Sequence, residues 1–173
     1  MKKNERSFYI NKDEKIVSAT AEYMAFFRAI ETAKGKEAIF SDPLAADFLD
    51  KPSRRLMVRL SGIGFVRSAI IRVIDSYWPG ARSSGIARTR LIDDLLSPAL
   101  SEREIQAVIL GSGFDSRAYR IPRIGQVTVF EVDHPVTQKR KISRLAKCGW
   151  RKPLNLRLLE IDFEKQTLDD VLS

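Results

Sequence analysis

Two glycines follow directly behind an apolar run in the stretch VILGSGFDSRAYRIP, residues 108–122. Because Gly111 and Gly113 have no side chains, the backbone of such a turn can approach a bound molecule closely. Two acidic residues, Glu131 and Asp133, stand 20 and 22 positions after Gly111. A carboxylate placed there, at the end of the next strand, can accept hydrogen bonds from ribose hydroxyls. The spacing predicts a site for a cofactor that contains a nucleoside.

The position after the two glycines separates two classes of cofactor. A dinucleotide fingerprint has a third glycine at residue 116, where a pyrophosphate meets the start of a helix. This chain has Ser116 there, preceded by Asp115. A carboxylate at that place would repel a pyrophosphate but not the sulfonium and ammonium groups of S-adenosylmethionine. The pattern therefore favours methyl transfer over nicotinamide chemistry, although a G-x-G turn alone is a weak signal.

Helical patterns fill the first hundred residues. The first expected helix runs from Asp13 to Lys34, and Gly35 ends it. A short helix follows, capped by Ser41 or Asp42 and with Pro43 in its first turn. Two further helices are expected, from Arg54 to Tyr77 with Gly62 and Gly64 as break points, and over residues 84–96. The stretch WPGARSS before the last helix is expected to be a turn.

After residue 105 the pattern changes to strands that alternate with helices. Strands are expected at 106–110, 127–132 and 156–161, with a helix at 134–147. The first strand, QAVIL, has the unbroken apolar character of a strand buried on both faces. This order predicts an α/β fold with a parallel, doubly wound sheet. Residues 1–100 are expected to form a helical cap packed on the core, and residues 101–173 the first half of the cofactor-binding domain.

The net charge of +8 raises the question of a nucleic-acid partner. Residues 101–157 hold 12 Lys or Arg against 5 Asp or Glu. Their centre, QKRKISRLAK, also fits the solvated face of a helix with Val136, Ile142 and Leu145 beneath it. Aromatic residues are not interleaved with the basic ones, as they are in single-strand binders, so nucleic acid is not the expected partner.

Composition argues against other classes of site. Cys148 and His134 are the only cysteine and the only histidine, so neither a disulfide framework nor a metal site is expected. No apolar run is long enough to cross a bilayer, and no apolar segment follows the N-terminal lysines. We expect a cytoplasmic protein without a membrane partner.

Several motifs, taken together, resemble a known family. VILGSGFDSRAYRI followed by VFEVDHP, with RAIETAKGKEAIFSDPLAADFL, ARTRLIDDLL and LEIDFEK in the family's order, is similar to the leucine carboxyl methyltransferase family and its bacterial relatives, regarded as S-adenosylmethionine-dependent O-methyltransferases. The resemblance covers most of the chain. It implies a Rossmann-like class I methyltransferase sheet with a helical N-terminal cap, and we expect this sheet to be truncated after its third strand.

The resemblance also implies a set of residues that hold the cofactor: Arg88, Gly111, Gly113, Asp133, Asp162 and Phe163. The arginine would pair with the methionyl carboxylate, and the two glycines would form the turn. The first acid would bind the ribose and the second the adenine amino group, while the phenylalanine would pack on the adenine ring. No catalytic residue is assigned.

Each of these residues also has a structural interpretation. Arg88 fits an ordinary exposed helix residue, and Asp133 fits a cap for the helix that Pro135 begins. Asp162 fits a cap for a last helix, with Phe163 in the core.

The expected function is methyl transfer to a carboxylate or hydroxyl of a small molecule or a protein. One alternative is a non-catalytic cofactor-binding or interaction protein, the remnant of a methyltransferase. Another is a basic, nucleic-acid-associated protein. Because the strand QAVIL is expected to be unpaired on one side, a homodimer that covers this edge is a further expectation.

Overall fold

The computed structural model describes residues 12–101 and 105–172, so predictions for residues 1–11 lie outside the described part. The helical first half consists of α1 (Lys12–Thr32), η1 (Gly35–Glu37), α2 (Pro52–Leu60), α3 (Gly64–Tyr77) and α4 (Ala81–Ala99). The second half consists of β1 (Gln106–Leu110), α5 (Arg117–Arg120), η2 (Ile124–Gln126), β2 (Thr128–Asp133), α6 (Pro135–Lys147), β3 (Leu156–Glu160) and α7 (Asp169–Leu172). The predicted change to alternating strands and helices after residue 105 is confirmed.

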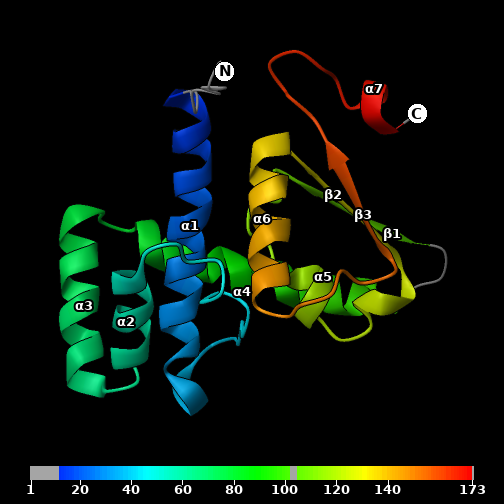
Figure 1. Ribbon diagram of the computed structural model, residues 1–173. Helices are drawn as coiled ribbons and strands as arrows, with labels where there is room; N and C mark the ends of the chain where they lie inside the picture. The colour runs from blue at the N-terminus through cyan, green and yellow to red at the C-terminus, as the bar shows by residue number, and fades with distance from the viewer. Residues whose placement is uncertain (1–11, 102–104, 173) are drawn as a thin grey trace, which may run out of the picture.

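The three strands form one parallel sheet in the order β1-β2-β3. Val129 of β2 lies opposite Ala107 of β1 and Leu156 of β3. Figure 1 shows this sheet on one side of the molecule, the hairpin of α2 and α3 on the other, and α1 and α6 between them. Because parallel strands end at the same edge, the turn after β1 and Asp133 at the end of β2 come together. The predicted α/β fold is confirmed.

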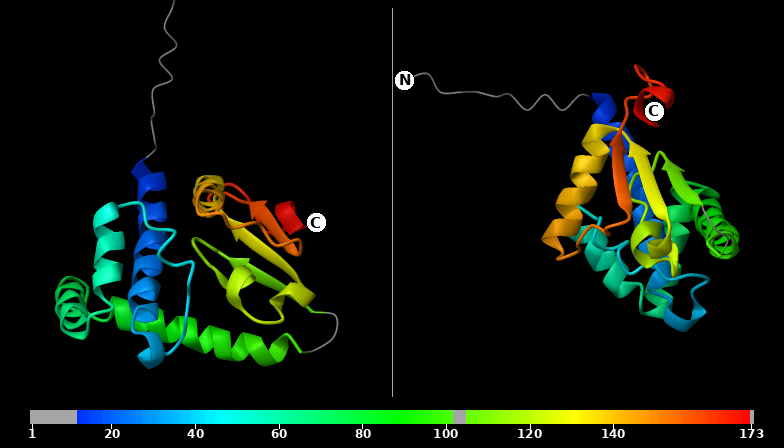
Figure 2. Two further views of the ribbon diagram at one scale, coloured as in Figure 1. Left: turned by 60° about the horizontal axis from the view of Figure 1, so that its bottom comes forward. Right: turned by 90° about the vertical axis from the view of Figure 1, so that its right-hand side faces the viewer.

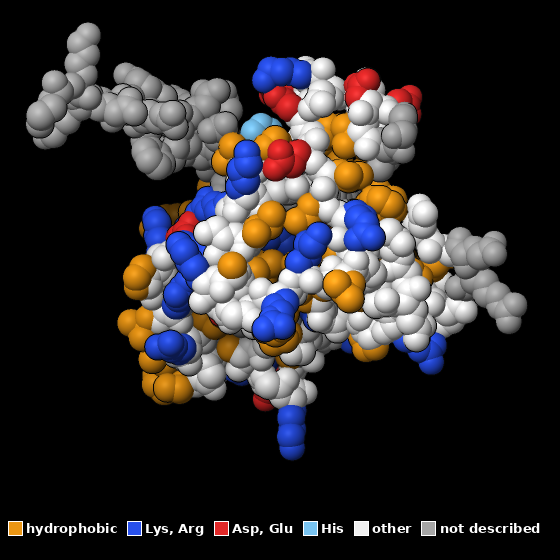
Figure 3. Space-filling model, turned by 45° about the vertical axis from the view of Figure 1, so that its right-hand side comes forward, with side chains coloured by type: hydrophobic (Ala, Val, Ile, Leu, Met, Phe, Trp, Pro, Cys, Tyr) orange, Lys and Arg blue, Asp and Glu red, His pale blue; other side chains and the backbone are white. Residues whose placement is uncertain are grey.

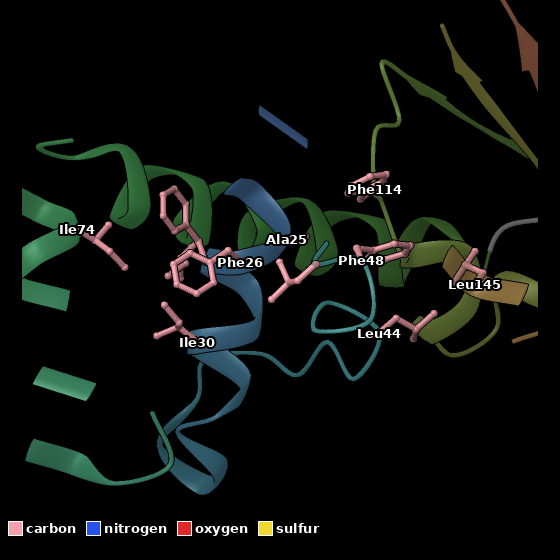
Figure 4. Close-up of a cluster of buried hydrophobic side chains, with 11 residues drawn as sticks. Ala25, Phe26, Ile30, Leu44, Phe48, Ile74, Phe114 and Leu145 are labelled. Carbon is pink, nitrogen blue, oxygen red and sulfur yellow. The ribbon is translucent and has the colours of Figure 1, made fainter. Parts of the chain in front are cut away.

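A cluster of buried apolar side chains joins the helical part of the chain to the sheet. Figure 4 shows members of this cluster from α1, α3 and α6 and from the segment that precedes α2. Phe48 stacks on Phe114 of the turn after β1, with ring centroids 5.1 Å apart. A second cluster, around Val129 and Leu156, packs α5 and η2 on the sheet. The helices and the turn after β1 therefore share one core.

The segment from Asp42 to Phe48 is not the short helix that its sequence predicts. Residues 43–48 form successive turns, in which the amide of Ala45 donates to the carbonyl of Asp42 at 3.2 Å. The carboxylate of Asp42 also accepts from the amide of Leu44 at 3.2 Å. Such a local side-chain bond offers the backbone an alternative to a helix, and it lets both Leu44 and Phe48 enter the core.

The other predicted helices are found within a few residues of their expected bounds, but α4 extends three residues beyond its predicted range of 84–96 at each end. The predicted break at Gly62 and Gly64 is confirmed, since α2 ends at Leu60 and α3 begins at Gly64. The stretch WPGARSS is only partly a turn, because α4 already begins at Ala81. Gly80 provides the positive φ of 77° at the residue before the helix. Figure 2 shows α4 running from the hairpin towards the start of β1.

Three positions that the sequence places in the interior are exposed. Val108 and Leu110 of β1 are 46% and 53% exposed, because within the described residues β1 pairs with β2 alone. Ile142, expected beneath α6, is also exposed, whereas its neighbour Leu145 is buried. An apolar run therefore indicated a strand correctly but overestimated its burial.

Truncation of the stacked ring at Phe48 should destabilise the fold. Phe48 is fully buried, so Phe48→Ala removes its contacts and leaves a cavity, which should lower the free energy of unfolding by about 3–5 kcal/mol. Denaturant unfolding followed by circular dichroism measures this change. Phe65→Ala is the matched control, because Phe65 is 79% exposed; an equal loss in both variants would contradict the packing described above.

Candidate functional site

A cavity of about 520 Å³ lies at the edge where the carboxyl ends of the strands meet. Its walls come from α1, α4, the turn after β1, the end of β2 and the start of α6. The charged residues of the lining are Arg28, Arg88, Asp115, Arg117 and Asp133. Of the six residues predicted to hold a cofactor, this cavity brings together Arg88, Gly111, Gly113 and Asp133.

The glycine turn is fixed to β2 through the carboxylate of Asp133. Gly111 and Gly113 have φ values of 60° and 50°, which residues with side chains rarely adopt. The amide of Gly113 donates to Oδ2 of Asp133, and the amide of His134 donates to Oδ1 at 2.6 Å. A Cβ added to Gly111 would meet no atom within 4 Å. The turn is thus held open towards the cavity by a buried acid.

The helix cap predicted for Asp133 is made by another residue. His134 is the N-cap of α6, and its Nδ1 accepts a hydrogen bond from the amide of Val136 at 3.3 Å. Asp133 instead accepts hydrogen bonds from the amides of Gly113 and His134.

Helices α1 and α4 each line the cavity with one helical face. On α1 the lining residues Thr20, Met24 and Arg28 follow at intervals of four. On α4, Gly85 and Ile92 belong to the lining. A Cβ at Gly85 would lie only 3.1 Å from Sδ of Met24, so this glycine permits the close approach of the two helices.

Arg88 projects from the same face of α4 and is exposed. Among the described residues its guanidinium makes neither an ion pair nor a side-chain hydrogen bond, unlike that of Arg90 two positions later, which pairs with Asp94. Arg88 is therefore a cation at the cavity that has its hydrogen-bond donors available for a ligand.

Arg28 and Asp42 connect the helical part to the backbone of the glycine turn. Nε of Arg28 donates to Asp42 at 2.8 Å, and its second nitrogen donates to the carbonyl of Phe114 at 2.6 Å. The hydroxyl of Ser116 donates to the same oxygen of Asp42 at 2.6 Å. Since Asp42 is 1% exposed, these bonds are shielded from water.

A second buried network joins α4 to the turn. Arg117 donates from Nε to Asp93 at 2.7 Å and forms an ion pair with Asp115. Burial alone would raise the pKa of Asp115, but the positive charges of Arg117, Lys141 and Arg28 outweigh it, and the pKa is lowered. Asp115 is therefore an ionised carboxylate in the cavity wall.

Glu131, the alternative ribose acid, faces the interior. Its carboxylate forms a buried ion pair with Lys141 of α6, and it does not line the cavity. Burial raises the pKa of Glu131, and the neighbouring charges of Asp115 and Asp133 act in the same direction against the effect of Lys141. Burial, together with the charge of Glu131, raises the pKa of Tyr119. The placement favours Asp133 over Glu131 as a ligand.

Asp162 and Phe163 lie outside the cavity lining. Asp162 forms an ion pair with Lys165 at 2.6 Å and accepts from the amide of Glu164 at 3.1 Å. These two bonds lower the pKa of Asp162. Phe163 is 53% exposed rather than part of the core. Their roles towards adenine stay predictions.

Sequence reasoning missed the polar wall that the two helices supply. Arg28 and Asp42 fit a network within the helical part, yet they also reach the turn after β1. Asp93 gave no signal beyond its place on a helix, because its partner Arg117 is 24 residues away. The four-residue spacing of Thr20 and Met24 on α1 was the one pattern that could have indicated a shared face.

Neither a metal site nor a membrane-spanning helix is found in residues 12–101 and 105–172. These residues contain no group of three or more His, Cys, Asp or Glu side chains that could hold a metal ion. None of their helices combines the length and the apolar character needed to cross a membrane.

Comparison with known proteins gives one family and a set of bacterial relatives. The family model for leucine carboxyl methyltransferases matches residues 21–173. A protein of Mycolicibacterium paratuberculosis is 34% identical over 148 residues, which cover 84% of this chain and 46% of the relative. A protein of Mycobacterium tuberculosis (strain ATCC 25618 / H37Rv) is 32% identical, with 84% and 47% covered.

Both relatives are named provisionally as S-adenosyl-L-methionine-dependent methyltransferases. A protein of Mycobacterium sp. (strain JLS) with the same name is 32% identical over 158 residues and is covered to 48%. The chain thus spans about half the length of the relatives that it matches.

Loss of the charge at Asp42 should weaken the connection between the helices and the turn. Asp42→Asn leaves the partly buried Arg28 without its counter-ion, so we expect the free energy of unfolding to fall by roughly 3 kcal/mol. Urea unfolding at neutral pH measures the loss. In the control Asp94→Asn only an exposed pair is removed, and the change should stay below about 0.5 kcal/mol. If Asp42→Asn lowered the free energy of unfolding by an equally small amount, Asp42 would not be the connection between the helices and the turn.

Proposed function

Because the chain belongs to the leucine carboxyl methyltransferase family, we propose that it binds S-adenosylmethionine in this cavity and supplies the cofactor site of an O-methyltransferase. One observation carries the proposal. Arg88 on α4, which has no side-chain partner among the described residues, and a buried carboxylate at the end of β2 lie in the lining of one cavity, with an open glycine turn between them in the sequence.

The residues present fit this cofactor. Arg88 supplies a planar set of donors for the methionyl carboxylate. Asp133 supplies acceptor oxygens for the ribose hydroxyls. The space beside Gly111, which a Cβ would enter without meeting protein atoms, admits the ligand close to the backbone. Met24 and Ile92 add apolar surface to the same cavity.

When bound, the cofactor would supply a methyl carbon activated by a positively charged sulfur, for transfer to an acceptor oxygen. The residues described here contribute position rather than covalent chemistry. The turn, Asp133 and Arg88 fix one reactant, and positioning of this kind can account for much of a rate enhancement.

The choice of acceptor depends on whether the site contains a general base. A carboxylate acceptor is already ionised and needs none, whereas a hydroxyl must lose a proton. Among the described residues of the lining, Asp115 has a lowered pKa and Asp133 already accepts two backbone hydrogen bonds. Both are poor bases, so we propose a carboxylate of a small molecule or protein as the acceptor, in a cytoplasmic setting.

We also propose a second copy of the chain as a partner at the open edge of β1. The amide of Gly111 donates to Val132, and backbone groups alternate along a strand. The amides and carbonyls of Gln106, Val108 and Leu110 therefore point away from β2. This strand carries no charge, so two copies can pair antiparallel about a two-fold axis at Val108 without charge repulsion.

The proposed cofactor site predicts which ligands the chain binds. S-Adenosylhomocysteine should bind to the purified chain in a calorimetric titration, and NAD should not. Arg88→Met should weaken this binding by roughly tenfold to a hundredfold, because a charge-assisted hydrogen bond is lost. Arg90→Met, on the same helix but paired with Asp94, is the control and should bind as the wild type does.

Two results would reject the cofactor proposal. One is a folded wild-type chain that binds neither S-adenosylmethionine nor S-adenosylhomocysteine. The other is equal binding by the variants at Arg88 and Arg90. Asp133→Ala gives an independent check at the ribose end of the site, where weaker binding is expected.

The second prediction concerns the dimer. Val108→Lys should shift the chain from dimer to monomer in sedimentation equilibrium, because it places two like charges opposite each other at the two-fold axis. A mixture of Val108→Lys and Val108→Glu chains should associate again. Val73→Lys changes an equally exposed valine on α3 and should leave the dimer intact. A wild type that is monomeric at high concentration contradicts the proposal.

A further inference from the structure

We infer that Asp115 is a further ligand-binding residue, whose carboxylate accepts a hydrogen bond from the α-ammonium group of the methionine part of the cofactor, and that Arg117 is its positioning residue. The inference rests on the proposed cofactor site and adds a residue to it. Arg88 would bind the carboxylate of the methionine part, and Asp115 would bind its ammonium group.

An ammonium group inside the cavity needs an acceptor, because a charge withdrawn from water without a partner is strongly unfavourable. Within the described lining only two carboxylates are present, Asp115 and Asp133. Each oxygen of Asp133 already accepts one backbone hydrogen bond, from Gly113 and His134, and its remaining acceptor sites are taken up by the ribose in the proposed complex. Asp115 is the carboxylate that is left.

The carboxylate of Asp115 is held in place by a single arginine. Oδ1 accepts from the backbone amide of Arg117 at 2.7 Å, and Oδ2 accepts from its guanidinium. A carboxylate has about four acceptor sites, so these two bonds leave one site on each oxygen for a ligand. Arg117 thereby fixes the orientation of the acid without using it up.

Arg117 is itself fixed from the opposite wall. Its Nε donates to Asp93 at 2.7 Å and its third nitrogen donates to the carbonyl of Thr89 at 3.3 Å. Both partners lie on α4, and Thr89 is the residue directly after Arg88. One segment of α4 therefore positions Arg88 and, through Arg117, the carboxylate of Asp115.

The charge pattern matches the proposed ligand. The methionine part of S-adenosylmethionine carries a carboxylate and an ammonium on one carbon atom. The cavity offers an exposed arginine and an ionised aspartate, and both are tied to the same helix. Positive charges of Arg117, Lys141 and Arg28 around Asp115 lower its pKa and keep it ionised at neutral pH.

Two ligands that differ only in the ammonium group test the inference. S-Adenosylhomocysteine and its deaminated analogue, in which hydrogen replaces the α-amino group, are titrated calorimetrically into the wild type and into Asp115→Asn. The wild type should prefer the amine by roughly tenfold to a hundredfold. In Asp115→Asn this ratio should fall to within about threefold of unity.

Three controls separate recognition of the amine from other effects. Arg88→Met should weaken both ligands equally and leave their ratio unchanged, since both contain the carboxylate. Asp94→Asn removes an exposed acid of α4 and should leave both affinities unchanged. Because each result is a ratio measured on one protein sample, partial unfolding of a variant cancels. If Asp115→Asn does not fold, Asp115→Glu takes its place, and its displaced carboxylate should lower the ratio at least threefold.

The outcomes distinguish this inference from the proposed function. A wild type that binds neither ligand refutes the cofactor site itself. A wild type that binds both ligands equally, or an Asp115 variant that keeps the full preference for the amine, overturns the role of Asp115 and leaves the cofactor site standing.

Discussion

The buried carboxylate of Asp42 is the contact on which the geometry of the cavity depends. It accepts from Arg28 on α1 and from Ser116 in the turn after β1, two residues far apart in the sequence. Both of these parts of the chain contribute to the walls of the cavity. Because the side chain is almost completely buried, water does not compete for its oxygens. One short acidic side chain thus sets the distance between the helices and the glycine turn.

Charges around the cavity alternate in a continuous series rather than forming isolated pairs. Asp42 is followed by Arg120, Arg120 by Asp93, Asp93 by Arg117 and Arg117 by Asp115. Buried ion pairs of this kind contribute little net stability, because the cost of removing each charge from water offsets their attraction. Their directional bonds nevertheless fix the side chains in one arrangement. The network is therefore better understood as a device for precise geometry.

Figure 3 shows a different pattern on one outer face, where Lys and Arg are spread among hydrophobic side chains and most Asp and Glu gather near the upper end.

Local patterns in the sequence predicted the elements and long-range contacts decided the details. The strands follow from apolar runs, and the glycine turn follows from residues such as Gly111, which can adopt the positive φ that the turn requires. The segment after Asp42 has the composition of a helix, yet a side-chain bond to Leu44 and the burial of Phe48 hold it in turns. The exposure of Val108 could not be read from its strand, because it depends on which neighbour lies beside β1.

Contacts in the folded chain also bear on why the glycine turn does not suit a dinucleotide. Asp115 is ionised, but its ion pair with Arg117 partly offsets its repulsion of a pyrophosphate. The backbone amides supply a better reason. A pyrophosphate requires free amides in the glycine turn and at the start of the following helix. Here Gly113 donates to Asp133 and Arg117 donates to Asp115, and α5 is a single turn of four residues. Side-chain carboxylates thus occupy the donors that a pyrophosphate would need, whereas a nucleoside with an amino-acid tail can be bound by the side chains that remain.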